Sequence, residues 1–326
     1  MVKRLLRATV QAVVSAAAPA LWRRRRDQLL VIMYHRVLPV AHPARASEQP
    51  GMYVSPASFA MHVDILRRHF TLVHLDDWLR ARSAGQPLPQ RACAITFDDG
   101  WRDNYDHAFP VLQAAGAPAT IYLVSDLVGT SYSFWPNTLA RLLLANDVAA
   151  NPRLPDWLRA EMRAYAVIDT AAVDAIIASC KLRPDAEMQA VVDAANGGPP
   201  AARDLLSWEE VDAMSRSGLV RFGSHTRWHT RASGMTSDAQ LQDEILGSRA
   251  RLQLRLGYVP QSFCYPNGEV SEGALKVVRS GYLGAVTTER GWNPPRADAH
   301  LLRRVGVHED VAGTPAAFRS RLAGVG

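Results

Sequence analysis

Strand-like runs that alternate with amphipathic helix patterns are the feature that most restricts the fold of this chain. Eight runs rich in β-branched and apolar residues begin at Leu29, and segments with helical periodicity separate most of them. Such alternation is typical of repeated β–α units around a parallel sheet or a barrel. A chain of 326 residues can form one barrel-sized domain or a domain that carries a substantial insertion. The predicted strands cover residues 29–35, 71–75, 93–99, 119–124, 220–226, 262–266, 284–288 and 301–307.

The alternation stops between Gly129 and about Leu206. Residues 135–144, 156–167 and 171–182 have helical periodicity without strands between them, and the loop-like run NGGPPAAR follows. We therefore predict a helical insertion at about 130–206 whose Trp, Leu and Ile side chains pack against one another.

Charge and cysteine content narrow the class of protein. The formal net charge is +6, and much of it comes from the N-terminus. The rest of the chain has no basic stripe interleaved with aromatic residues, so we expect no nucleic-acid binding. Three widely spaced cysteines argue against a disulfide framework and against a cysteine zinc site. They indicate a reducing compartment, and we expect a cytoplasmic protein.

The N-terminal segment, residues 1–28, is predicted to be distinct from a main domain at 29–326. Basic clusters bracket its apolar window, residues 8–22, which is shorter than the ~20 residues of a spanning helix. One interpretation is an interfacial helix on the inner face of the membrane, in which residues 1–26 contact anionic lipid and Val10, Val13, Val14 and Trp22 enter it. The other is a helix packed on the main domain.

An aspartate pair and a histidine pair stand at the ends of two predicted strands. Asp98 and Asp99 are adjacent carboxylates, which repel each other unless a cation or a proton relieves them. His225 and His229, four residues apart, can present two imidazoles to one point, although this spacing alone also occurs by chance on surface helices. Reactive groups of a β–α barrel collect at the C-terminal ends of its strands. Together, Asp99, His225 and His229 predict a three-ligand metal site with positions left for water.

The chain resembles a known family in these motifs and in several others. TFDDG (96–100) and SHTRWH (224–229) look like the first two signature motifs of the polysaccharide deacetylases, the chitooligosaccharide-deacetylase homology domain of carbohydrate esterase family four. The resemblance extends from VIMYHRV through LSWEEV and SFCYPNG to AVTTERGWN, over about residues 29–308, and the insertion is its least matched part. It implies a distorted (β/α) barrel of about seven strands with a helical insertion.

The resemblance also implies a reaction, the removal of N-linked acetyl groups from an N-acetylated sugar in a polysaccharide, oligosaccharide or lipid-linked glycan. By the same resemblance Asp99, His225 and His229 match the ligands of a divalent metal, usually Zn²⁺, and Asp98 matches the catalytic base. Zinc with three protein ligands suits this chemistry, because it acidifies water and polarises a carbonyl.

Other roles implied by the resemblance depend on less regular motifs. The backbone N–H of Tyr265 in FCYPNG matches the donor to the oxyanion. The arginine near the start of the third motif and the late leucine-x-x-histidine of many members are not evident here. In the branch with an N-terminal YH motif, His35 takes the role of general acid and Arg304 holds Asp98 by a charge-assisted pair. His308 is the alternative acid.

Two rival functions remain open on the sequence. One is a catalytically weakened barrel that binds glycan or scaffolds a surface-polysaccharide assembly, which the altered motifs favour. The other is a related hydrolase of a non-sugar amide. The complete set of metal ligands and base favours the deacetylase. Trp101, Trp228 and Trp292 lie in or near motif loops, where each can stack on a sugar ring or pack in the core. The sequence does not indicate an oligomeric state.

Overall fold

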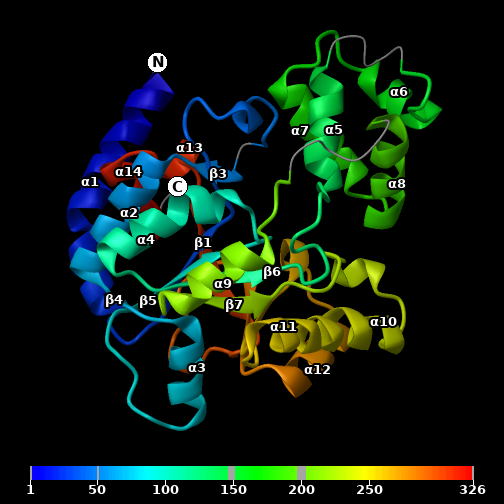
Figure 1. The fold of residues 1–326 in the computed structure, drawn as a ribbon. Helices are drawn as coiled ribbons and strands as arrows, with labels where there is room; N and C mark the ends of the chain where they lie inside the picture. The colour runs from blue at the N-terminus through cyan, green and yellow to red at the C-terminus, as the bar shows by residue number, and fades with distance from the viewer. Residues whose placement is uncertain (1, 50, 146–150, 197–202, 325–326) are drawn as a thin grey trace.

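A parallel β-barrel forms the body of the protein, and a helical lobe stands beside it (Figure 1). The computed structural model describes residues 2–49, 51–145, 151–196 and 203–324. Seven strands follow one another in the order β1–β10–β9–β8–β7–β6–β5, and β5 pairs back with β1 to close the ring. The predicted distorted (β/α) barrel of about seven strands is thus confirmed. The strands are β1 (Leu30–Tyr34), β5 (Ala92–Phe97), β6 (Ala119–Leu123), β7 (Val220–Ser224), β8 (Ser262–Cys264), β9 (Gly284–Arg290) and β10 (Leu302–Gly306).

Strands β1, β5 and β6 consist of almost continuous apolar runs because both of their faces are covered. All six residues of β5 are buried, as expected for a parallel strand between a barrel interior and an outer layer of helices. A short strand, β4 (Thr71–Leu72), extends the sheet beside the start of β5. Two further short strands, β2 (Arg36–Val37) and β3 (Tyr53–Val54), pair outside the barrel.

Local capping signals determine where the outer helices begin. Ser55 accepts a hydrogen bond from the Ser58 backbone at the start of α2, and Ser207 forms a capping box with Glu210 at the start of α9. These helices and their neighbours cover the barrel and leave the C-terminal ends of the strands accessible. The outer helices are α2 (Pro56–His69), α3 (Leu75–Ser83), α4 (Phe109–Ala115), α9 (Trp208–Arg216), α10 (Asp238–Gln242), α11 (Ser248–Leu256), α12 (Glu272–Gly281), α13 (Glu309–Ala312) and α14 (Pro315–Ala323).

The predicted helical insertion is present and has a hydrophobic core of its own. It contains α5 (Trp135–Leu144), α6 (Asp156–Met162), α7 (Thr170–Cys180) and α8 (Asp185–Asn196), with no strand among its described residues. Apolar side chains of these four helices form one buried cluster, separate from the clusters of the barrel. Part of the loop-like run that closes the predicted insertion, residues 197–202, lies outside the described residues.

Buried polar contacts hold the insertion over the barrel. Arg231 donates from Nε to Asp185 Oδ2 at 2.7 Å and from its two Nη atoms to the carbonyls of Lys181 and Arg183. Asn137 donates to both carboxylate oxygens of Glu48 at 2.9 Å. Charge-assisted contacts of this kind are stronger than neutral ones, so the insertion is a fixed wall beside the strand ends.

The N-terminal helix α1 (Val2–Arg24) packs on the barrel domain. Trp22 is buried against His69 and Phe70, and Ser320 of α14 donates to the carbonyl of Gln11. The prediction that Trp22 enters lipid is therefore wrong, because its ring fills a gap between α1 and α2. The Val10 side chain lies outside the described residues, and Val13 remains exposed. Among the described residues, no helix has the length and apolarity that crossing a membrane requires.

Candidate active site

Polar side chains from three strand ends meet at one mouth of the barrel. His35 follows β1, Asp98 and Asp99 follow β5, and His225 follows β7. With His229, these residues line one cavity of about 430 Å³. Ligand sites of βα barrels lie at this end of the strands, so the predicted reactive residues come together where the fold favours a site.

The predicted metal ligands converge on one point. Asp99 Oδ1 lies 3.3 Å from His225 Nε2 and 3.4 Å from His229 Nε2. One ligand atom from each residue falls within 4.8 Å of the other two. The backbone of Asp99 has φ 72° and that of His229 has φ 65°, both in the left-handed region that residues other than glycine rarely adopt. Such strain persists where the surrounding structure imposes it, and here it turns both side chains toward His225.

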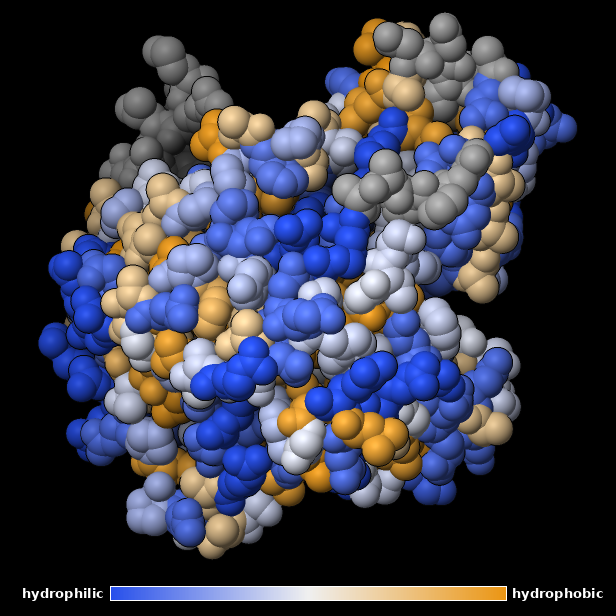
Figure 2. All heavy atoms as spheres, in the orientation of Figure 1, coloured by the Kyte–Doolittle hydropathy of each residue, from blue (hydrophilic) through white to orange (hydrophobic). Residues whose placement is uncertain are grey.

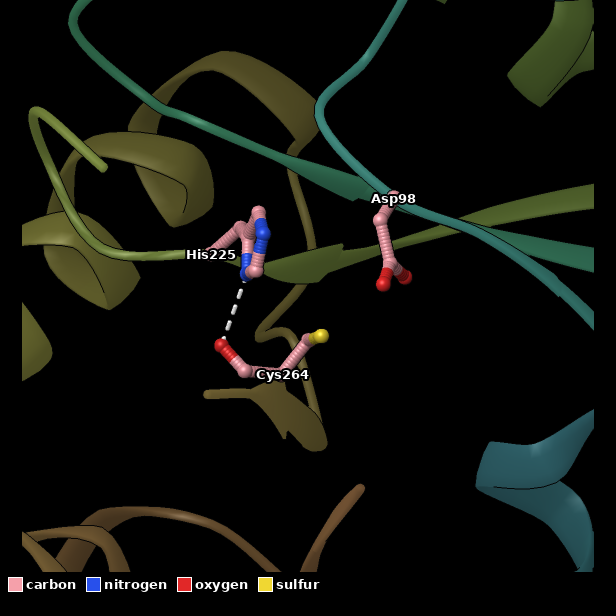
Figure 3. Close-up of side chains that lie close together, drawn as sticks. All are labelled: Asp98, His225 and Cys264. Carbon is pink, nitrogen blue, oxygen red and sulfur yellow. Dashed lines mark hydrogen bonds between the residues drawn. The ribbon is translucent and has the colours of Figure 1, made fainter. Parts of the chain in front are cut away.

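Neighbouring groups orient the three ligands. His225 Nδ1 donates to the Cys264 carbonyl at 2.8 Å (Figure 3), so Nε2 is the ring nitrogen that faces Asp99. Trp101 Nε1 donates to Asp99 Oδ2 at 2.9 Å, and the ring of Phe134 packs edge-on against His229. A backbone acceptor on the distal nitrogen and a donor on the carboxylate are the usual supports of ligands that bind a metal. The donor set therefore fits a divalent cation such as Zn²⁺, which binds histidine nitrogens and carboxylate oxygens in this combination.

The electrostatics of Asp99 agree with this assignment. Burial by itself raises the pKa of its carboxyl, but hydrogen bonds to His225 and His229 outweigh burial and lower that pKa well below its ordinary value. Asp99 is thus an anion at neutral pH, the form that a cation requires.

A second group of candidate ligands, Asp98, His225 and Cys264, shares His225 with the first (Figure 3). Both oxygens of Asp98 accept from Arg304, whose Nη2 also lies 3.3 Å from Cys264 Sγ. Burial raises the pKa of the Cys264 thiol, which disfavours the thiolate. A guanidinium at this position would repel a metal ion, so we assign this group to the support of the site.

Asp98 forms a buried ion pair with Arg304. Arg304 donates from Nη1 to Oδ1 and from Nη2 to Oδ2, each at 2.7 Å, and neither residue is more than 3% exposed. Burial raises the pKa of the Asp98 carboxyl, but the charge and the hydrogen bonds of Arg304 lower it below its ordinary value. The predicted contact between Arg304 and Asp98 is present, and it keeps Asp98 ionised.

The structure places the two candidate acids differently. His35 lines the cavity, and its Nε2 lies 3.8 Å from Asp98 Oδ2. Asn104 supports it by donating to the His35 carbonyl at 2.9 Å. His308 does not line this cavity, and its Nδ1 lies 3.3 Å from Asp310. The geometry favours His35 as the acid.

The prediction for Tyr265 is contradicted. Its backbone N–H donates to the Val286 carbonyl at 3.2 Å as part of the β8–β9 ladder, and Tyr265 does not line the cavity. The amide therefore has a partner in the sheet and is not directed at a substrate. Asn267, two residues later in the same loop, has φ 54° and lines the cavity.

Several cavity residues could not be identified from the sequence because they come from the insertion. Lys181 and Asp185 lie about 40 residues before the motif SHTRWH (224–229), and only the packing of the insertion brings them to the cavity. Of the three tryptophans in the motif loops, Trp228 and Trp101 line the cavity and Trp292 does not. Trp228 is half exposed, whereas Trp101 is buried and supports Asp99. The remaining cavity residues from this side are Tyr132, Phe134, Trp135, Pro136 and Asn137.

Comparisons with known proteins identify the fold and the family. The YxkH protein of Bacillus subtilis (strain 168) is 23% identical over 290 residues, which cover 88% of this chain and 74% of that protein. The poly-β-1,6-N-acetyl-D-glucosamine N-deacetylase of Escherichia coli (strain K12) is 44% identical over 86 residues, which are 26% of this chain and 13% of that enzyme. The structure of the Streptococcus pyogenes deacetylase PplD in complex with acetate has the same fold, with a TM-score of 0.61 and 17% identity over 90% of this chain and 98% of that chain.

The family comparison covers the region that contains the paired motifs. The family model for polysaccharide deacetylase matches residues 85–284, which include both the aspartate pair and the histidine pair. Since this match spans more than half of the chain, the protein belongs to the polysaccharide deacetylase family, whose chemistry is the hydrolysis of N-acetyl groups on sugars.

Proposed function

We propose that the protein is a metal-dependent N-deacetylase that acts on N-acetylated sugar units of a polysaccharide, oligosaccharide or lipid-linked glycan. One observation carries the proposal, the convergence of Asp99, His225 and His229 beside an ionised Asp98. The three converging residues would hold the cation, and their nitrogen and oxygen donors suit Zn²⁺. When bound, the ion supplies a Lewis acid that polarises the acetyl carbonyl and lowers the pKa of a water molecule to about 7.

Asp98 has the properties of a general base. Arg304 holds its carboxylate ionised and in a fixed orientation, and each oxygen retains a lone pair for a further hydrogen bond. In the proposed reaction Asp98 takes a proton from the attacking water, and the C–N bond of the acetamide then breaks to give acetate and an amine.

His35 would complete the reaction. An amine leaving group must gain a proton as the C–N bond breaks, and His35 lies at the cavity close to Asp98. The family's usual acid and its third-motif arginine are not evident in the sequence, and His35 and Arg304 stand in their place. Their positions argue against a catalytically weakened barrel.

Acetate release from N-acetylated oligosaccharides tests the proposal. Chains of β-1,6-linked N-acetylglucosamine are the first substrate to use, because the Escherichia coli relative acts on that polymer. We expect acetate release that a chelator abolishes and that added Zn²⁺ restores. We also expect no acetate release from the Asp98→Asn protein. Release that survives the chelator would contradict the metal requirement, and release from Asp98→Asn would contradict the base. Glycan binding without any acetate release would favour the rival function, a catalytically weakened barrel that binds glycan or scaffolds an assembly.

A further inference from the structure

The helical insertion meets the barrel without sharing its hydrophobic core. Its apolar side chains form a cluster of their own, and the molecular surface is indented where this lobe meets the barrel (Figure 2). Individual polar and aromatic contacts therefore decide how the lobe is held. Two of the connections that start in the lobe end at the candidate metal ligands Asp99 and His229.

The first connection runs from α5 to a buried arginine. Asn137 of α5 donates to both carboxylate oxygens of Glu48 at 2.9 Å, and Glu48 in turn accepts from Arg36 Nη1 at 2.6 Å. Arg36 also donates from Nε to Asp103 Oδ2 at 2.8 Å. The arginine and its two carboxylate partners are each at most 7% exposed. Charge-assisted bonds to two buried carboxylates fix the guanidinium plane of Arg36.

The same arginine lies over the ring that orients a metal ligand. The guanidinium carbon of Arg36 is 4.1 Å from the ring centroid of Trp101, within the range of a cation–π interaction. Trp101 is 1% exposed, and its Nε1 donates to Asp99 Oδ2 at 2.9 Å. A donor that orients a ligating carboxylate typically changes metal affinity by about 10–100-fold. Arg36 therefore acts on Asp99 through the ring of Trp101, and Arg36 itself does not line the cavity.

The second connection is aromatic. Phe134 directly precedes α5, and its ring centroid lies 5.0 Å from that of His229 and 5.3 Å from that of Trp101. Phe134 and Asn137 thus stand at the start of the same helix. A movement of the lobe away from the barrel would withdraw support from both metal ligands at once.

We propose that the helical insertion positions the metal ligands, with Arg36 and Trp101 as the positioning residues. Docking of the lobe and binding of the cation then strengthen each other by the same factor, because coupling between two equilibria is reciprocal. This inference rests on the proposed function, since it requires the cation that Asp99, His225 and His229 would hold.

Affinity for Zn²⁺, measured by competition with a chromophoric chelator, tests the positioning residues. Trp101→Phe keeps an aromatic ring beneath Arg36 but removes the donor to Asp99, and Arg36→Met removes the charge that holds the ring. We expect each substitution to raise the Kd for Zn²⁺ by about tenfold. The double variant should bind about as weakly as Trp101→Phe alone, because Arg36 acts through the donor that Trp101→Phe lacks. Arg159→Met breaks an ion pair inside the insertion and is the matched control, which should keep the wild-type Kd.

Hydrogen exchange of the wild-type protein tests the coupling to the insertion and does not depend on whether a variant folds. Amide exchange in α5, α7 and α8 is measured by mass spectrometry with a chelator and with saturating Zn²⁺. We expect Zn²⁺ to slow exchange through opening of the lobe by about tenfold, the same factor by which docking strengthens the metal site. Helix α3, which lies far from the insertion in Figure 1, is the internal control and should change little. In Asp99→Ala protein, which lacks a ligand, Zn²⁺ should have no effect on the insertion.

Two results would overturn the inference. One is an equal Kd for Zn²⁺ in wild type, Trp101→Phe and Arg36→Met. The other is exchange in the insertion that is the same with and without Zn²⁺. In either case a wild-type protein that binds Zn²⁺ and releases acetate retains the proposed function, so only the role of the insertion fails. A wild-type protein that binds no Zn²⁺ would refute both proposals.

Discussion

Removal of the Arg304 side chain probes the buried charge on which the proposed base depends. Arg304→Met retains the length of the side chain but deletes both hydrogen bonds to Asp98. Loss of one partner from a buried ion pair leaves an uncompensated charge, which typically costs about 3–5 kcal/mol. We expect a decrease in the free energy of unfolding of this size near neutral pH.

The pH dependence of that decrease follows from the pKa of Asp98. In the native protein Arg304 lowers this pKa below that of an unfolded aspartate, about 3.9, so the pair stabilises the fold above that pH and loses its effect as the pH falls through the lower native value. Without Arg304, burial raises the pKa, and the variant loses stability as the pH rises through the raised value. The difference between the two proteins should therefore be complete near pH 7 and should shrink as the pH falls towards the lower native pKa of Asp98.

Urea unfolding measures this difference. The titrations are followed by circular dichroism in the presence of a chelator, at several pH values between about 3 and 7. Arg303→Met is a matched control, because the neighbouring Arg303 forms an exposed pair with Glu289 and should contribute about 0–1 kcal/mol. In Asp98→Asn/Arg304→Met protein the pH dependence should disappear. A decrease below about 1 kcal/mol, or one that does not depend on pH, would refute the argument that burial governs this pair.

Further predictions concern the acid, a buried histidine and the N-terminal helix. His35→Ala should lower turnover by about 10²–10⁴-fold without loss of bound metal, whereas His308→Ala should remain near wild type, and the opposite result in steady-state assays would transfer the acid role to His308. Burial lowers the pKa of His62 to about 4, so stability should fall by about 3 kcal/mol as the pH drops from 6.5 to 4, and an equal fall in His62→Gln would contradict this origin. We propose that the exposed Arg23 and Arg24 contact anionic lipid at about 1 kcal/mol each, and equal sedimentation of wild type and Arg23→Glu/Arg24→Glu with anionic vesicles would refute that contact.

Local patterns made the barrel and the convergence of the candidate metal ligands predictable from the sequence. Strands β1, β5 and β6 are almost continuous apolar runs, and the capping signals at Ser55 and Ser207 act over three residues. Asp99, His225 and His229 meet because parallel strands end at the same mouth of the barrel. The position of each motif at the end of a strand was therefore enough to predict that these side chains converge.

Features that depend on packing at a distance were not predictable. The apolar window around Trp22 suits a membrane surface and a protein surface equally well. Only the packing of the Trp22 ring against Phe70 in the folded domain distinguishes the two. The ladder bond from Tyr265 to Val286 depends on the register between β8 and β9, which the motif FCYPNG does not specify. The cavity wall from the insertion depends on contacts such as that of Arg231 with Asp185.

Metal content is the most direct test of the central claim. The account predicts that the purified wild-type protein binds one divalent ion per chain, measured by inductively coupled plasma mass spectrometry after equilibration with Zn²⁺ and removal of excess ion. Asp99→Ala and His229→Ala should lose that ion, while Asp98→Asn should retain it and release no acetate. Equal metal content in wild type and in Asp99→Ala, or an active wild-type enzyme without bound metal, would contradict the account.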